Sequence, residues 1–159
     1  MQNNATVSGN TSNYGSGVYV RGTFTMQDNA SVSGNGARSG GGVYAKGRTF
    51  TIRDNASVSG NTASSEGGGV YVGGGTFTMQ DNTSVSGNTA SQNGGGVCVN
   101  SGTFTKSGGT IYGNNETDVK LRNTASNGHV VYNNNGNTWR NATAGPTMNT
   151  DTFGFWMND

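Results

Sequence analysis

The chain has 159 residues, a length suited to one domain, and it is unusually polar, with 11% charged residues, 29 glycines and a net charge of +1. A near-neutral charge without a basic run argues against binding to nucleic acid or to an anionic membrane surface. The single cysteine, Cys98, excludes an intrachain disulfide, and no apolar stretch is long enough for membrane insertion in this segment.

Short motifs recur along the chain with a period of 26 or 27 residues. VYV or a close variant stands at 18–20, 43–45, 70–72 and 97–99, and TFT stands at 23–25, 49–51, 76–78 and 103–105. VSGN or a close variant stands at 7–10, 32–35, 58–61, 85–88 and 111–114. Such a period is typical of stacked-repeat proteins. Residues 1–10 align with 26–35, so the sequence begins within a repeat, as a fragment of a longer protein would.

Each period predicts three short strands, because apolar and polar residues alternate within each motif. In the first strand the valines face inward and the residue between them faces out. In the second strand a phenylalanine faces inward, and these residues form a core stack: Phe24, Phe50, Phe77 and Phe104. In the third strand Val or Ile faces inward between serines. We therefore expect an all-β right-handed parallel β-helix (β-solenoid), with three strands per 26–27-residue coil and about five coils.

The turns support stacking of equivalent residues. An asparagine ends the third strand at a constant phase, which predicts a ladder of side-chain amides formed by Asn10, Asn35, Asn61, Asn88 and Asn114. The glycine before each of these asparagines suits a turn with positive φ. Loop length varies between the asparagine and the next first strand.

The repeats weaken after Asn114, which divides the chain into a repeat array (1–114) and a degenerate last coil with a C-terminal cap (115–159). Val119 and Leu121 suggest one degenerate strand, and Val130 and Val131 another. Large apolar residues without repeat spacing then follow: Trp139, Phe153, Phe155, Trp156 and Met157. An exposed coil end needs a cover, so we expect these side chains to form the cap, with ligand binding as the alternative role.

The tandem combination of GGGVYV, GTFTMQDN and SVSGNTA over residues 1–125 resembles the repeats of bacterial surface proteins, such as polymorphic outer-membrane proteins and autotransporter passengers. In this chain the asparagine follows Val-Ser-Gly, whereas the family repeat closes a Phe-x-x-Asn unit. The resemblance implies a right-handed parallel β-helix that is secreted or displayed on the cell surface as an adhesin-like module or stalk.

Catalysis is not expected from this sequence. Parallel β-helix enzymes need clustered acids, bases or Ca²⁺ ligands beside a groove, whereas this chain has eight acidic residues and one histidine, without recurring acid–base pairs, and its loops are short. No cofactor is expected. Asp28, Asp54 and Asp81 recur at one turn, where they suggest either a calcium column or, as we favour, Asp-Asn turn residues that bond the local backbone.

Two outward files remain as candidate binding surfaces. If phenylalanine faces inward, the flanking threonines form two columns: Thr23, Thr49, Thr76 and Thr103, and Thr25, Thr51, Thr78 and Thr105. A flat T-x-T array resembles the ice-binding face of β-solenoid antifreeze proteins, although threonine also suits any exposed strand. Tyr19, Tyr44 and Tyr71 form an aromatic file for contact with a ligand or for mutual stacking, and Cys98 is expected at the surface in their register.

These observations predict a non-enzymatic extracellular solenoid that presents an adhesin-like surface to carbohydrate or protein, or that acts as a rigid spacer. Ice binding through the threonines is the first alternative. The second is end-to-end self-association into filaments through open coil ends.

Overall fold

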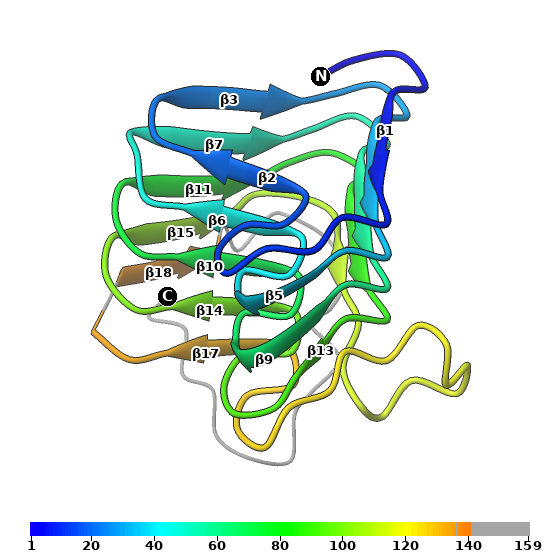
Figure 1. Ribbon diagram of the computed structural model, residues 1–159. Helices are drawn as coiled ribbons and strands as arrows, with labels where there is room; N and C mark the ends of the chain where they lie inside the picture. Colours follow the sequence, from blue (N-terminus) through cyan, green and yellow to red (C-terminus); the bar gives the residue numbers. More distant parts are fainter. Residues whose placement is uncertain (136, 141–159) are drawn as a thin grey trace.

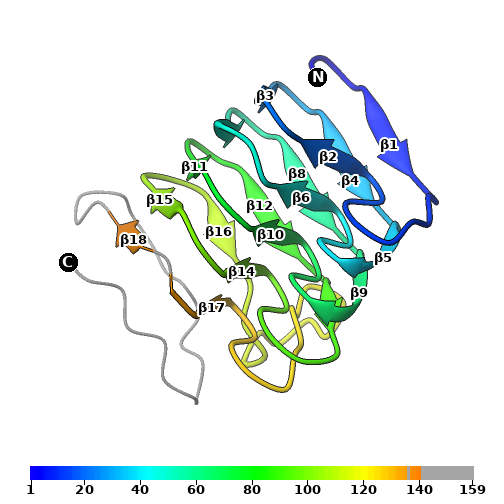
Figure 2. The same ribbon diagram turned by 60° about the vertical axis from the view of Figure 1, so that its left-hand side comes forward.

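The computed structural model describes residues 1–135 and the backbone of residues 137–140, and these described residues contain no helix. The chain passes repeatedly through three strand positions, each of which builds one five-stranded parallel sheet (Figures 1 and 2). The first sheet contains β1 (Thr6–Ser8), β4 (Ser31–Ser33), β8 (Ser57–Ser59), β12 (Ser84–Ser86) and β16 (Thr110–Ile111).

The other two large sheets are built in the same order along the stack. The second contains β2 (Val18–Val20), β6 (Val43–Ala45), β10 (Val70–Val72), β14 (Val97–Val99) and β17 (Val131–Asn133). The third contains β3 (Thr23–Met26), β7 (Thr49–Ile52), β11 (Thr76–Met79), β15 (Thr103–Lys106) and β18 (Asn137–Arg140). The result is a parallel β-solenoid of about four turns with coils of about 27 residues, which confirms the predicted fold class.

A fourth sheet lies where the sequence predicts only a loop of variable length. It has three strands: β5 (Gly36–Ser39), β9 (Thr62–Glu66) and β13 (Thr89–Ala90). Alternation is weak there because only the small residues Ser39, Ala63 and Ala90 are buried. Register also shifts between Ala37 and Ser39, so this segment has no regular sequence signature.

The interior is a column of stacked side chains. Phe50, Phe77 and Phe104 are fully buried and stack face to face, with ring centroids 4.9 Å apart at both steps. Phe24 continues the stack at 5.8 Å but is only half-buried. The stack follows from parallel pairing in register, since Phe50 pairs with Phe77 and Phe77 with Phe104.

A ladder of asparagine side chains runs through the turn after the third strand. At each step the backbone N–H and the Nδ2 group of one asparagine both donate to Oδ1 of the next, as when Asn61 donates to Asn88 at 2.9 and 3.0 Å. The second Nδ2 hydrogen reaches a backbone carbonyl, which for Asn61 is that of Val32. Asn35, Asn61 and Asn88 are buried, so each step satisfies polar groups that have no access to water. The glycines before the ladder have φ between 63° and 70°: Gly9, Gly34, Gly60 and Gly87.

The fifth member of the ladder is Asn123, and the prediction of Asn114 is wrong. Asn88 donates to Oδ1 of Asn123 through its backbone N–H and its Nδ2 group, both at 2.9 Å. Asn123 follows Asn88 by 35 residues instead of 27, because a loop of eight extra residues is inserted after β16. This loop, 113–122, projects from the side of the stack (Figure 1, yellow). Asn114 lies within it, and its Oδ1 is buried without a hydrogen-bond partner.

Of the two degenerate strands predicted after residue 114, the one around Val131 is present and the one around Val119 is not. Val131 begins β17, which pairs with β14, and β18 pairs with β15. Val119 is 65% exposed in the inserted loop and belongs to no strand. Residues 141–159, which contain Phe153, Phe155, Trp156 and Met157 of the predicted cap, lie outside the described residues, so the cap stays a prediction.

Truncation of the central phenylalanine should destabilise the protein strongly. We expect Phe77→Ala to lower the free energy of unfolding by about 3–5 kcal/mol, because it removes a fully buried ring between two stacked neighbours. Denaturant unfolding followed by far-UV circular dichroism measures the change. Phe24→Ala, at the half-buried end of the stack, is the matched control and should cost clearly less; equal losses would contradict the inward stack.

The corrected ladder gives a second prediction. Asn123→Ala leaves two buried N–H donors of Asn88 without acceptors, and each unsatisfied donor should lower the free energy of unfolding by about 1–3 kcal/mol. Asn114→Ala, in contrast, removes a side-chain oxygen that accepts no hydrogen bond. The unfolding free energies of the two variants should therefore differ by several kcal/mol. A loss at Asn114 as large as that at Asn123 would show that the ladder passes through Asn114.

Candidate functional site: the threonine face and its neighbours

The outward side of the third sheet carries two straight columns of threonine, which we call the threonine face. Parallel pairing aligns Thr23 with Thr49, Thr49 with Thr76 and Thr76 with Thr103, and the second column repeats this alignment from Thr25 to Thr105. Thr23 is exposed and the other seven are half-buried. In β18 the equivalent register positions are Asn137 and Trp139, so the double column has four ranks.

Sheet geometry fixes the spacing of this face. Strands stack about 4.8 Å apart, and residues two apart along a strand lie roughly 6.6 Å apart. Equivalent threonines on neighbouring strands lie side by side, an arrangement that suits β-branched residues. Because the phenylalanine stack lies beneath, the rows are held on a rigid support. The threonine face is therefore a regular lattice of hydroxyl and methyl groups.

The first sheet presents a second hydroxyl surface, but the inserted loop reaches onto it. Its outward residues are serines and threonines, among which Thr6 and Ser31 share a hydrogen bond of 3.0 Å. At the other end the backbone N–H of Gly87 donates to the carbonyl oxygen of Leu121, and the adjacent Ser86 is only 8% exposed. The inserted loop therefore covers this surface at one end.

The outward tyrosines stack on one another. The ring centroids of Tyr19 and Tyr44 are 5.2 Å apart with a 3° angle between planes, and those of Tyr44 and Tyr71 are 4.8 Å apart. Tyr14, which sequence reasoning missed, meets Tyr44 edge-on at 5.4 Å. Exposure falls along the file, from 38% at Tyr19 to 7% at Tyr71. Tyr44 is thus stacked between two rings, and Arg21 lies over the ring of Tyr19, with its Cζ 5.6 Å from the ring centre.

Burial raises the pKa of Cys98 and of two tyrosines of the file. Cys98 is fully buried, which corrects the expectation of a surface position, because the turn at Gly94 crosses directly over its Cβ. Burial, with a smaller effect of Glu66, raises the pKa of the Cys98 thiol to about 12. Burial likewise raises the pKa of Tyr44 and of Tyr71. A neutral buried thiol is a poor nucleophile.

The recurring aspartates form a ladder of their own. The backbone N–H of Asp28 donates to Oδ2 of Asp54 at 3.1 Å, that of Asp54 donates to Oδ2 of Asp81 at 3.0 Å, and Asn3 donates in the same way to Asp28 at 2.8 Å. All four residues have φ between 51° and 59°. Each carboxylate therefore bonds the backbone of the preceding coil, a third arrangement beside the calcium column and the turn pair weighed from the sequence.

Two further features were missed from the sequence. Lys106 is 1% exposed, and it lies in β15 at the inward position that Met26, Ile52 and Met79 occupy in the other coils. The inserted loop carries four charged residues: Glu116, Asp118, Lys120 and Arg122. The alignment of TFTK with TFTM could have marked position 106 as inward, whereas nothing in the repeat predicts the shape of the loop.

The described residues show no group of three His, Cys, Asp or Glu side chains that could hold a metal ion. Within the same part of the chain, no helix is long and apolar enough to span a membrane. Comparison with protein-family models, curated proteins and solved structures found no match to this chain. The arrangement of the outward files is therefore the basis for a functional proposal.

Proposed function

We propose that this chain is a non-catalytic extracellular binding module, secreted or displayed at the cell surface, whose threonine face contacts the ligand. The observation that carries the proposal is the exact parallel pairing of eight threonines on four neighbouring strands above a fully buried phenylalanine stack. The resemblance of the repeats to bacterial surface proteins supports an adhesin-like role.

Rigidity makes such a face suitable for adhesion. The strands, the asparagine ladder and the aspartate ladder hold every coil to the next, so little conformational entropy is lost when a ligand binds. Identical groups at a constant spacing also allow a polymeric ligand, carbohydrate or protein, to form many weak contacts at once. The same rigidity suits a spacer that holds other domains away from a cell surface.

A bulky side chain on the threonine face should block binding without unfolding the protein. Purified protein would be tested against immobilised polysaccharides and matrix proteins, with Thr51→Tyr as the disruptive variant. We expect affinity to fall about tenfold or more, because a tyrosine in the centre of the lattice prevents flat contact. Ser59→Tyr, on the first sheet of the same coil, is the matched control. Equal losses in both variants, or no ligand for the wild type, would refute the proposal.

A second candidate function is ice binding. It is favoured by one specific observation: both threonine columns run through four coils without interruption or register shift. A flat, rigid lattice of hydroxyl and methyl groups offers ordered positions for water molecules, as the likeness to antifreeze solenoids implies.

The ice assay separates the two candidates. If the face binds ice, the wild type should show thermal hysteresis and inhibit ice recrystallisation, Thr51→Tyr should lose most of this activity, and Ser59→Tyr should retain it. Wild-type protein without either activity would end the ice hypothesis and leave the adhesive role standing.

End-to-end self-association finds less support. The asparagine ladder finishes inside the molecule, where the backbone N–H of Asn123 donates to the carbonyl oxygen of Tyr112 at 3.2 Å and its Nδ2 reaches the same oxygen. These donors are therefore engaged and are not available to asparagine oxygens of another molecule.

A further inference from the structure

One corner of the solenoid gathers positive charge that the sequence does not show as a run. It consists of Arg21, between β2 and β3, and of Lys46 and Arg48, between β6 and β7, and we call it the basic corner. All three side chains are exposed. The backbone N–H of Lys46 donates to Val20 O at 3.0 Å and that of Arg48 to Gly22 O at 3.2 Å, which places the three residues on adjacent coils.

The charge of this corner is not neutralised by the part of the chain that the structure describes. None of its three cations forms an ion pair there, and Cζ of Arg21 lies 5.6 Å from the centre of the Tyr19 ring. Like charges on adjacent coils repel one another, so an anion between them would relieve the repulsion.

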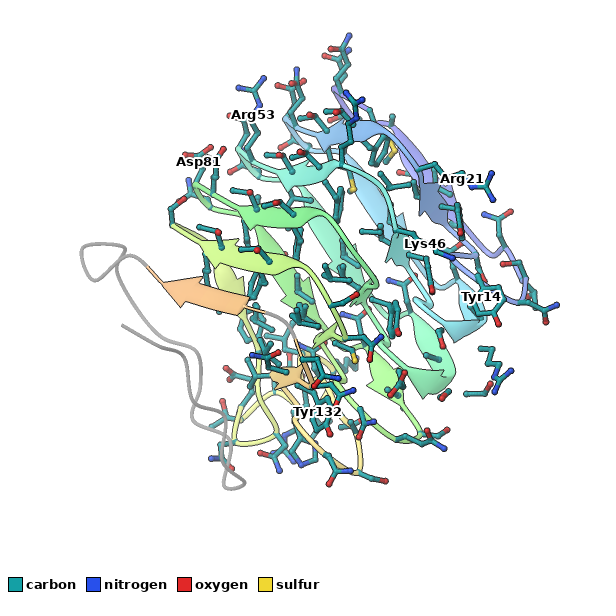
Figure 3. All side chains as sticks on the ribbon, turned by 90° about the vertical axis from the view of Figure 1, so that its left-hand side faces the viewer. Tyr14, Arg21, Lys46, Arg53, Asp81 and Tyr132 are labelled. Atoms are coloured by element: carbon teal, nitrogen blue, oxygen red, sulfur yellow. The ribbon has the colours of Figure 1, made fainter. Side chains whose placement is uncertain are left out.

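Acidic groups lie at the opposite edge of the threonine face. The aspartate ladder follows β3, β7 and β11, whereas the basic corner precedes β3 and β7. Figure 3 shows this separation: Arg21 and Lys46 lie along one side of the molecule, and Arg53 and Asp81 lie along the other. The basic corner and the aspartate ladder therefore lie at opposite edges of the threonine face.

Threonine and tyrosine side chains and a glycine turn lie next to the basic corner. Thr23 and Thr49, the first two members of one threonine column, follow the corner in β3 and β7, and Tyr19, which is 38% exposed, precedes it. The equivalent corner of the next coil is Gly73–Gly75, which carries no side chain. The hydroxyl of Tyr44 lies close to this corner, 3.3 Å from the position that a Cβ atom on Gly73 would occupy. An extended ligand can therefore pass from the cations onto the threonine columns without meeting a bulky side chain.

We propose that the basic corner and the adjoining threonines bind an anionic polysaccharide, whose carboxylate or sulfate groups pair with the cations while its hydroxyls meet the threonines. This inference rests on the proposed function, since it takes the threonine face as the contact surface. A polysaccharide fits better than a nucleic acid, because bound single strands stack their bases on exposed aromatic faces. Here Tyr44 is stacked between Tyr19 and Tyr71, and the guanidinium of Arg21 lies over the Tyr19 ring.

The test uses alginate as a carboxylated probe, dextran sulfate as a sulfated probe and neutral dextran as the uncharged reference. The variant Arg21→Gln/Lys46→Gln/Arg48→Gln removes the corner, and Arg38→Gln/Arg53→Gln/Lys120→Gln removes three exposed cations elsewhere for the same change in net charge. We expect wild type to bind at least one charged probe and not dextran, with an affinity that falls as salt is raised from about 0.05 to about 0.5 M. The corner variant should bind about tenfold more weakly, and the control variant within about twofold of wild type.

Each other outcome overturns a defined part of the proposal. Equal losses in the two triple variants would show that net charge, not the corner, governs binding. A corner variant with wild-type affinity, beside a Thr51→Tyr variant that loses binding to its ligand, would refute the basic corner and leave the proposed function intact. Wild type that binds neither charged probe would refute the ligand class. Displacement of alginate by single-stranded DNA of equal charge at lower concentration would favour a nucleic acid instead.

Discussion

The constraint on which this structure depends is that each residue lies over its equivalent in the next coil. Parallel pairing in register creates this alignment, and the asparagine ladder holds it at the turn, where a single amide oxygen accepts two hydrogen bonds from the preceding coil. Once the turn is fixed, phenylalanine must stack on phenylalanine, aspartate on aspartate and threonine on threonine. The core and the surface lattice are therefore two results of one alignment.

The same constraint explains what could be predicted from the sequence. A strict period with alternating apolar residues places Phe77 inside and Thr76 and Thr78 outside, since both assignments follow from side-chain alternation in a strand. The ladder was predictable through Asn88 for the same reason. These features depend on residue type and phase, which the sequence states directly.

The features that were missed depend on contacts between segments whose spacing is not periodic. Asn123 enters the ladder because eight inserted residues leave the coil and return to it, and no local signal distinguishes Asn123 from Asn114. Cys98 was expected at the surface, yet the turn at Gly94 crosses over it. The basic corner was hidden because Arg21 is separated from Lys46 and Arg48 in the sequence and joins them only when coils stack.

The inserted loop has a consequence for how such a chain can change. Residues 113–122 leave the stack after β16, but pairing resumes in the same phase, with Thr89 opposite Thr124 and Val97 opposite Val131. The solenoid thus tolerates an excursion of several residues at this turn while the strands after it still pair in register with those of the preceding coil. We expect that new loops, including foreign peptides for display, can be grafted at the equivalent turns of other coils. The sequence and length of such a loop can then vary while the stacked strands stay paired.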